Sequence, residues 1–219
     1  MNWNEVIPQI PKLAQGGHDD FGPELCFMEM KNWLAGHPHS DAAECSSPVL
    51  AAYAICINDS GQEFRDLMAP LVPQMIGTKN ASLEDARLRH IVFGVAQRIV
   101  APTLRGRIND SLVDAIMTAE KYTNLRTACN SAARAAYVAD AADAGAVDVA
   151  YAARAADAGA DAADVASAAA ADVAADADQK FRETSVLILK EAIDLDTDRV
   201  PPQIDFERVE RLKELVYTN

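Results

Sequence analysis

Hydrophobic residues recur at helical spacing along most of the chain, and polar stretches between these runs hold residues that start and end helices. The spacing predicts helices at 23–36, 48–57, 64–75, 82–100, 181–193 and 206–216. No stretch alternates with the period of two that is typical of a β-strand. The expected fold class is therefore all-α, with a compact N-terminal helical module, a long alanine-rich helix with a heptad-like pattern, and C-terminal helices.

Several helix boundaries are predicted by single residues. Ser47 followed by Pro48 indicates a helix start, because serine caps the free amides and proline suits the first turn. Ser82 followed by Asp85 resembles a capping box. Pro102 is expected to end the helix that begins there, since proline removes a donor and clashes with the preceding turn.

The segment 131–178 is dominated by alanine, the best helix former, and a helix that starts at 110–111 is expected to lead into it. AADAGA at 141–146 recurs at 155–160, a spacing of two heptads. Steps of three and four define an uncharged seam of small residues, which we expect to mediate self-association. Its members are Ala135, Val138, Ala142, Gly145, Val149, Ala152, Ala156, Gly159 and Ala163, and it continues through Ala166, Ala170 and Val173.

Aspartates occupy the other positions of this segment and form a candidate acidic binding face. They are Asp140, Asp143, Asp148, Asp157, Asp161 and Asp164. A continuous helix would be on the order of 75 Å long at 1.5 Å per residue. Because alanine buries little apolar area, such a helix needs a partner along its length, either a second copy in a twofold dimer or the N-terminal layer.

Two other interpretations of this segment stay open. Gly145 and Gly159 could divide it into short stacked helices, because glycine costs about 1 kcal/mol relative to alanine inside a helix. Alternatively, the segment is a flexible spacer. We divide the chain into an N-terminal helical module at 1–110, the alanine-rich helix at 111–180 and a C-terminal segment at 181–219 that packs on the same core.

Charge and composition narrow the classes of function. The net charge of −13 and the pI near 4.6 argue against direct binding of nucleic acid, which needs clustered Lys and Arg. No signal peptide and no membrane-spanning run is expected, so the predicted location is the cytoplasm, or that of a host cell if a phage encodes the chain. Four cysteines in 219 residues do not predict a disulfide framework.

The segment 21–78 contains a series of short motifs, CFMEM, LAG, SD, a second cysteine, SPVLAA, ND and LVPQMIGT. Together they resemble the N-terminal module of a family of uncharacterised proteins of bacteriophages and actinobacteria, in which an alanine-rich helical repeat often follows. The resemblance implies an all-helical fold and no assigned activity. Its matching residues here are Cys26, Glu29, Asp41, Cys45, Asn58 and Asp59. Members of the family commonly have histidine and proline after SD, but this chain has Ala42 and Ala43 there. This difference argues against a metal-binding role for this part of the chain.

Glu29 lies on an otherwise apolar helix, so its carboxylate must find hydrogen-bond donors. We expect it to cap the helix that starts at Ser46 or Ser47, and catalysis is the alternative. Cys26 and Cys45 with His37 and His39 could in principle hold zinc, but their spacing is not that of a zinc motif, so buried thiols are expected and no metal or cofactor is predicted.

Asp194, Asp196 and Asp198 imitate the start of a calcium loop, but Arg199 stands where glycine is required, so a helix end is expected. The favoured function is a non-enzymatic, oligomeric binding protein of phage type. It would inhibit a basic host protein that serves in defence or handles nucleic acid, through the acidic face. The alternatives are a nucleotide-type sequestering protein with an interface pocket, and a metal- or cysteine-dependent enzyme built on Cys26, Glu29, His39, Asp41 and Cys45.

Overall fold

The computed structural model describes residues 2–138 and 179–217, and within these ranges the regular elements are helices and no strand forms. The α-helices are α1 (Trp3–Val6), α2 (Phe27–Leu34), α3 (Pro48–Asp59), α4 (Gln62–Met68), α5 (Glu84–Val95), α6 (Ala101–Leu104), α7 (Asp110–Met117), α8 (Tyr122–Val138), α11 (Gln179–Asp194) and α12 (Phe206–Tyr217). The predicted all-α fold class is confirmed. None of the helices in the described ranges has both the length and the apolar composition that a membrane-spanning helix needs.

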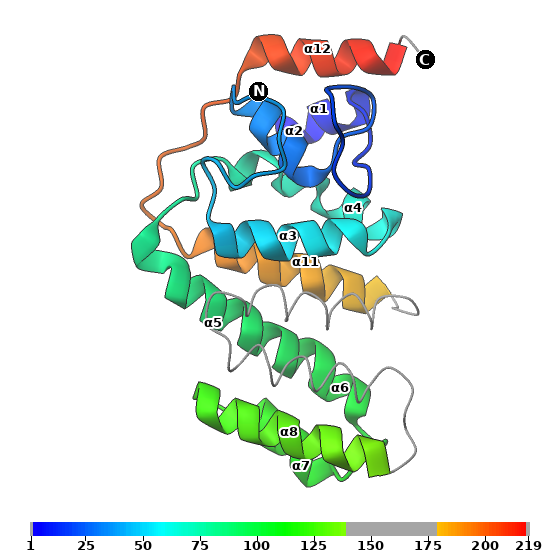
Figure 1. Ribbon diagram of the computed structural model, residues 1–219, viewed down its shortest axis with the longest axis vertical. Helices are drawn as coiled ribbons and strands as arrows, with labels where there is room; N and C mark the ends of the chain where they lie inside the picture. Colours follow the sequence, from blue (N-terminus) through cyan, green and yellow to red (C-terminus); the bar gives the residue numbers. More distant parts are fainter. Residues whose placement is uncertain (1, 139–178, 218–219) are drawn as a thin grey trace.

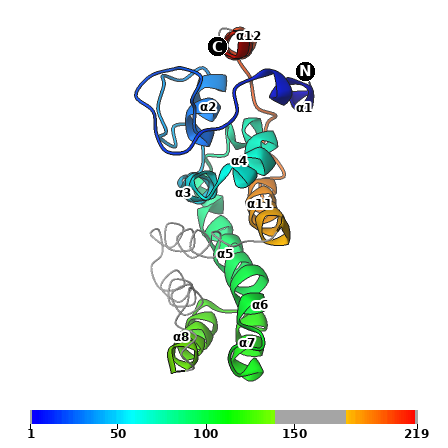
Figure 2. The ribbon, with the colours of Figure 1, turned by 90° about the vertical axis from the view of Figure 1, so that its right-hand side faces the viewer.

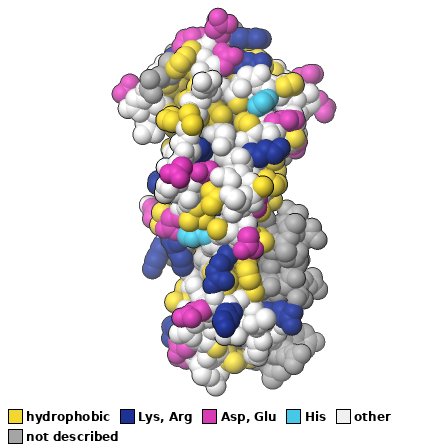
Figure 3. Space-filling model, turned by 90° about the vertical axis from the view of Figure 1, so that its left-hand side faces the viewer, with side chains coloured by type: hydrophobic (Ala, Val, Ile, Leu, Met, Phe, Trp, Pro, Cys, Tyr) yellow, Lys and Arg dark blue, Asp and Glu magenta, His cyan; other side chains and the backbone are white. Residues whose placement is uncertain are grey.

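The described helices form an elongated body (Figure 1). Helices α1, α2 and α12 lie at one end, the hairpin of α7 and α8 lies at the other, and α5 runs between them. Helix α11, near the C-terminus of the chain, lies against α3, α4 and α5, as both views show (Figures 1 and 2). The C-terminal helices therefore pack on the N-terminal ones. The space-filling view also shows the elongated form of the described part of the molecule (Figure 3).

The contact of α11 with α5 depends on the absence of a side chain. A Cβ atom at Gly94 would lie 3.1 to 3.2 Å from three carbon atoms of Ile188, so a side chain at this position would require Ile188 to shift. The Tyr53 hydroxyl on α3 donates a hydrogen bond to the carbonyl of Ser185 at 3.3 Å, which satisfies a fully buried phenol.

Some helix boundaries follow the sequence prediction and others do not. Ser47 caps α3 by accepting from the Leu50 amide at 3.2 Å, as expected. The prediction of a capping box at Ser82 is wrong. The Asn80 side chain accepts from the Ser82 amide and starts a short 3-10 turn instead. The helix expected at 64–75 ends at Met68, and Pro70 and Pro73 lie in the 3-10 turns that follow, as the effect of proline on a helix end leads one to expect.

The expected end before Pro102 is also wrong. A π-helical turn at 96–100 follows α5, in which the Ala101 amide donates to the Ala96 carbonyl five residues earlier. This turn shifts the hydrogen-bond register, so that Pro102 falls in the first turn of α6, where its missing donor costs little.

Helix α7 does not lead into the alanine-rich segment, contrary to expectation. It ends at Met117, a turn through Thr118 reverses the chain, and α8 begins at Tyr122 and packs along α7. Helix α8 includes Ala135 and Val138, the first two seam residues. The rest of the seam, the candidate acidic face and the question of one helix or several lie outside the described residues.

Candidate functional site

The candidate site forms where the loop that precedes α2 folds back over α2 and the end of α3. The Ala14 amide donates to the Leu25 carbonyl at 2.9 Å and closes the base of this loop. The Gly16 amide donates to Asp59 Oδ1 at 2.9 Å and fixes the loop to α3. Gly16 has a φ of 77°, a left-handed conformation that glycine adopts without strain.

Asn58 joins three segments at this place through its buried amide side chain. Its Oδ1 accepts from the Phe27 amide at 3.2 Å, at the start of α2, and its Nδ2 donates to the Ala14 carbonyl at 2.9 Å. Arg65 donates to the Asn58 carbonyl at 2.7 Å and so caps the end of α3. The adjacent ND motif therefore ties both the loop and α2 to α3.

Glu29 organises the loop from beneath, with a side chain that is 1 % exposed. Its Oε2 accepts from the Cys26 amide at 2.7 Å and from His18 Nδ1 at 2.8 Å, and its Oε1 accepts from the His18 amide at 2.5 Å. The Cys26 sulfur in turn accepts from the Glu29 amide at 3.5 Å, which completes a capping box.

The predicted partner of Glu29 was therefore wrong. The carboxylate caps its own helix, α2, and not the helix that starts at Ser47, because it lies in the first turn of α2, where the free amides are within reach. Burial by itself raises the pKa of Glu29, but the hydrogen bonds from Cys26 and His18 outweigh burial and hold its pKa below the usual value.

Two histidines, His18 and His39, lie close to the Glu29 carboxylate. His39 Nε2 donates to the His18 carbonyl at 2.7 Å and lies 3.7 Å from Glu29 Oε1. Since a carbonyl only accepts, His39 Nε2 carries the proton, and the buried Nδ1 of the same ring has no hydrogen-bond partner in the described part of the chain. The histidines hold the loop and the segment after α2 together.

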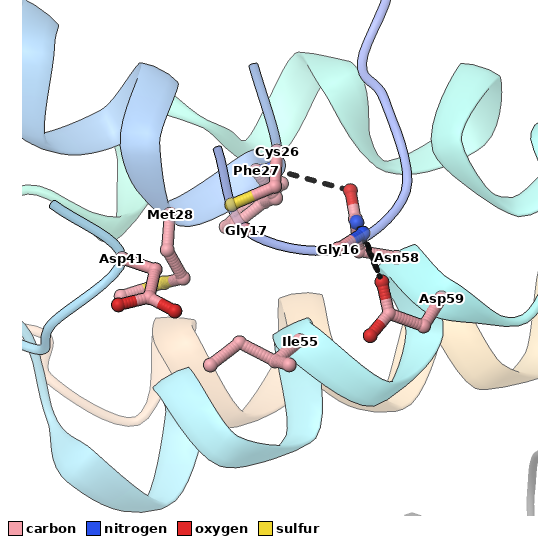
Figure 4. Close-up of a pocket in the computed structure, with 9 residues that line it drawn as sticks. All are labelled: Gly16, Gly17, Cys26, Phe27, Met28, Asp41, Ile55, Asn58 and Asp59. Atoms are coloured by element: carbon pink, nitrogen blue, oxygen red, sulfur yellow. Dashed lines mark hydrogen bonds between the residues drawn. The ribbon is translucent and has the colours of Figure 1, made fainter. Parts of the chain in front are cut away.

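A pocket of about 130 Å³ opens beside this network (Figure 4). Asp41 and Asp59 lie at its opposite ends, Ile55 lies on one side, and Met28 and the Cys26 sulfur lie on the other. The backbone of Gly16 and Gly17 forms part of its wall. A Cβ at Gly17 would lie 3.4 Å from Asp41 Oδ2, which is an ordinary van der Waals contact, so this carboxylate lies directly beside the loop backbone.

The charges around the pocket are negative. Asp59 Oδ1 accepts from Gly16 and from Asn58 Nδ2, the latter at 3.1 Å. In the described part of the chain, Asp59 Oδ2 and both carboxylate oxygens of Asp41 have no hydrogen-bond donor or cation as a partner. Of the residues that line the pocket, none is a lysine, an arginine or a histidine. The pocket therefore presents uncompensated carboxylates over an apolar floor.

Thiolate chemistry is disfavoured at Cys26. Burial, with the nearby Glu29 carboxylate, raises the pKa of this thiol to about 12, so it is protonated at neutral pH. Lys31 is also buried, and burial lowers its pKa. Its Nζ donates to the Asn32 side chain, and Asn32 Nδ2 donates to the Ala42 carbonyl at 2.9 Å, which secures the segment after α2.

The structure brings most of the motif residues named from the sequence together. Cys26, Asp41, Asn58 and Asp59 line the pocket, and Glu29 lies behind its wall. Cys45 does not line it. Reasoning from the sequence missed His18, whose contact with Glu29 is not signalled by any local pattern, although the Gly16–Gly17 pair before it indicates a close approach of backbone.

Within residues 2–138 and 179–217 no group of three histidine, cysteine or carboxylate side chains is placed to hold a metal ion. The helix end expected at Asp194 is observed. The Asp196 carboxylate accepts a hydrogen bond from the Asn80 side chain at 3.2 Å and lies 3.6 Å from Arg87.

Searches of protein families, of curated proteins and of solved structures found no match to this chain.

Proposed function

We propose that the chain is a binding protein whose pocket between the 14–25 loop, α2 and α3 holds a small organic cation. The observation that carries this proposal is the position of two carboxylates, from Asp41 and Asp59, at opposite ends of a pocket with an apolar floor. An ammonium group at each end would replace water at the carboxylates, while a short aliphatic chain would lie over Met28 and Ile55.

The volume limits the ligand. An apolar cavity of about 150 Å³ binds benzene, so 130 Å³ accommodates roughly five or six non-hydrogen atoms. A short aliphatic diamine has this size and this charge. A nucleotide is too large for this pocket, and its phosphates would be repelled by Asp41 and Asp59, so the alternative of a nucleotide site in an oligomer interface would need a different pocket.

The test is a calorimetric or NMR titration with 1,4-diaminobutane, compared with butylamine and with neutral 1,4-butanediol. We expect the diamine to bind most tightly, butylamine more weakly and the diol not measurably. Asp41→Asn and Asp59→Asn should each reduce diamine affinity about tenfold, as expected for loss of a charge-assisted hydrogen bond. Asn at position 59 can still accept from the Gly16 amide, so the loop should stay folded.

Asp20→Asn is the matched control, because Asp20 is exposed, lies in the same loop and is not part of the pocket wall. It changes the net charge by the same amount and should leave diamine binding unchanged. If all three substitutions weaken binding equally, the effect comes from overall charge and the proposal fails.

A second proposal rests on charge alone. The net charge of −13 supports the acidic helical face of 140–164 as a surface for a basic host protein, with the alanine seam joining two copies in a dimer. This role involves different residues from the pocket, so it is tested independently. Salt-sensitive capture of a basic protein by the wild-type chain, together with a dimeric native mass, would support it.

A further inference from the structure

A second pocket lies between the N-terminal arm, residues 3–13, and α4. Its volume is about 250 Å³, nearly twice that of the pocket beside Glu29. The indole Nε1 of Trp3 donates to the Ala69 carbonyl at 3.2 Å and fastens the arm across the end of α4. Pro8 and Pro11 restrict the backbone of the arm, which therefore forms a rigid wall of the pocket.

Most of the wall is apolar. It includes Trp3, Ile7, Ile10, Leu13, Met30 and Ala69. A concave, mostly apolar pocket with a small number of charged groups is the usual form of a small-molecule site. An apolar cavity of about 150 Å³ binds benzene, so this pocket accommodates roughly ten non-hydrogen atoms.

The polar group that distinguishes this pocket is Arg65, whose residue surface is 8 % exposed. Its Nη1 donates to the Asn58 carbonyl at 2.7 Å and its Nε donates to Gln62 Oε1 at 3.2 Å. A guanidinium carries five N–H donors, so these two bonds leave three without a described protein acceptor.

The charge of Arg65 is also uncompensated among the described residues. Asp66 lines the same pocket, but its Oδ2 lies 3.7 Å from Lys12 Nζ and its Oδ1 accepts from Gln62 at 2.8 Å. Both acceptors of Arg65 are neutral oxygens. The Nη2 group of Arg65 has no acceptor among the described residues, so an anionic ligand in the pocket would supply a charged partner for it.

We propose that this pocket binds a small carboxylic acid of about ten non-hydrogen atoms in total, with its carboxylate on Arg65 and an apolar body in the rest of the pocket. The planar guanidinium matches a carboxylate through two parallel hydrogen bonds, and the apolar body lies against Trp3, Ile7 and Met30. The site is separate from the proposed cation pocket, and either one can fail without the other.

Phenylacetate has ten non-hydrogen atoms and is the probe, and 2-phenylacetamide is its neutral control of the same shape. The chain has two tryptophans, so its NMR spectrum contains two indole N–H signals. Trp3 lines the pocket, and Trp33, whose indole donates to the Arg208 carbonyl at 3.1 Å, does not. Titration of either probe to about 10 mM covers dissociation constants in the millimolar range.

We expect phenylacetate to shift the Trp3 indole signal and leave that of Trp33 unchanged, with at least about tenfold tighter binding than the amide. Arg65→Gln should remove this preference for the acid. Because Arg65 also caps α3, a second variant, Ala69→Leu, fills the pocket and keeps the guanidinium, and it should abolish binding of both probes.

Arg107→Gln is the matched control, because Arg107 is an exposed cation that does not line the pocket, and it should change the affinity less than about threefold. The proposal is overturned if phenylacetate leaves the Trp3 signal unchanged, if the acid and the amide bind equally, or if Ala69→Leu binds phenylacetate as the wild type does.

Discussion

Replacing Glu29 with glutamine tests whether this one carboxylate holds the loop onto α2. Glutamine has the same shape but a single acceptor oxygen, so it cannot serve the donors at both carboxylate oxygens. In either orientation of the amide, an N–H from Cys26 or His18 loses its acceptor in a site that is 1 % exposed. An unsatisfied buried donor costs about 1–3 kcal/mol, and the remaining bonds lose their charge assistance.

The expected loss is therefore about 3 kcal/mol in the free energy of unfolding. For a chain of this length, 1 kcal/mol corresponds to roughly 2–4 °C, so Tm should fall by about 6–12 °C. Thermal and urea unfolding followed by circular dichroism at pH 7 measures both quantities. Glu24→Gln is the control, because the Glu24 side chain is 77 % exposed and lies 4.0 Å from the same histidine, and it should change Tm by less than about 2 °C.

The effect should depend on pH in one direction. The folded pKa of Glu29 lies below its ordinary value of 4.5, so its carboxylate stabilises the fold fully above that value and loses its contribution as pH falls through the folded pKa. The difference between wild type and the Glu29→Gln variant should be full at about pH 6–7 and shrink below about pH 4.5. A variant as stable as wild type at pH 7, or a difference that grows in acid, would refute this reasoning.

Two further predictions concern the core and the thiols. Gly94→Ala should destabilise the fold by about 1–3 kcal/mol, because its Cβ would crowd Ile188, and in an Ile188→Ala background the same change should become neutral or stabilising; equal effects in both backgrounds by urea denaturation would contradict this contact. Burial raises the pKa of Cys26 and of Cys129 to about 12, so iodoacetamide at pH 8 should alkylate at most two of the four thiols in the native chain and all four in urea, as counted by mass spectrometry; rapid labelling of all four in the native state would show that these thiols are accessible.

The sequence by itself determined the class of fold and the elements whose signals are local. Hydrophobic spacing placed the main helices because a helix needs only neighbours three and four residues apart. Ser47 with Pro48 marked the start of α3, and Gly36, with a φ of 78°, marked the stop after α2, because caps and left-handed turns are formed by adjacent residues.

Only the tertiary structure decided how the candidate site is assembled. The partners of Glu29 come from a loop eleven residues earlier as well as from its own helix. Asp41 and Asp59 lie at opposite ends of one pocket, and Asn58 and Asp59 hold the 14–16 backbone beside it. Such contacts follow from how elements pack and not from local spacing. The continuation from α5 to α6 also depends on packing. A π-helical turn at 96–100 shifts the hydrogen-bond register, so the chain stays helical through Pro102.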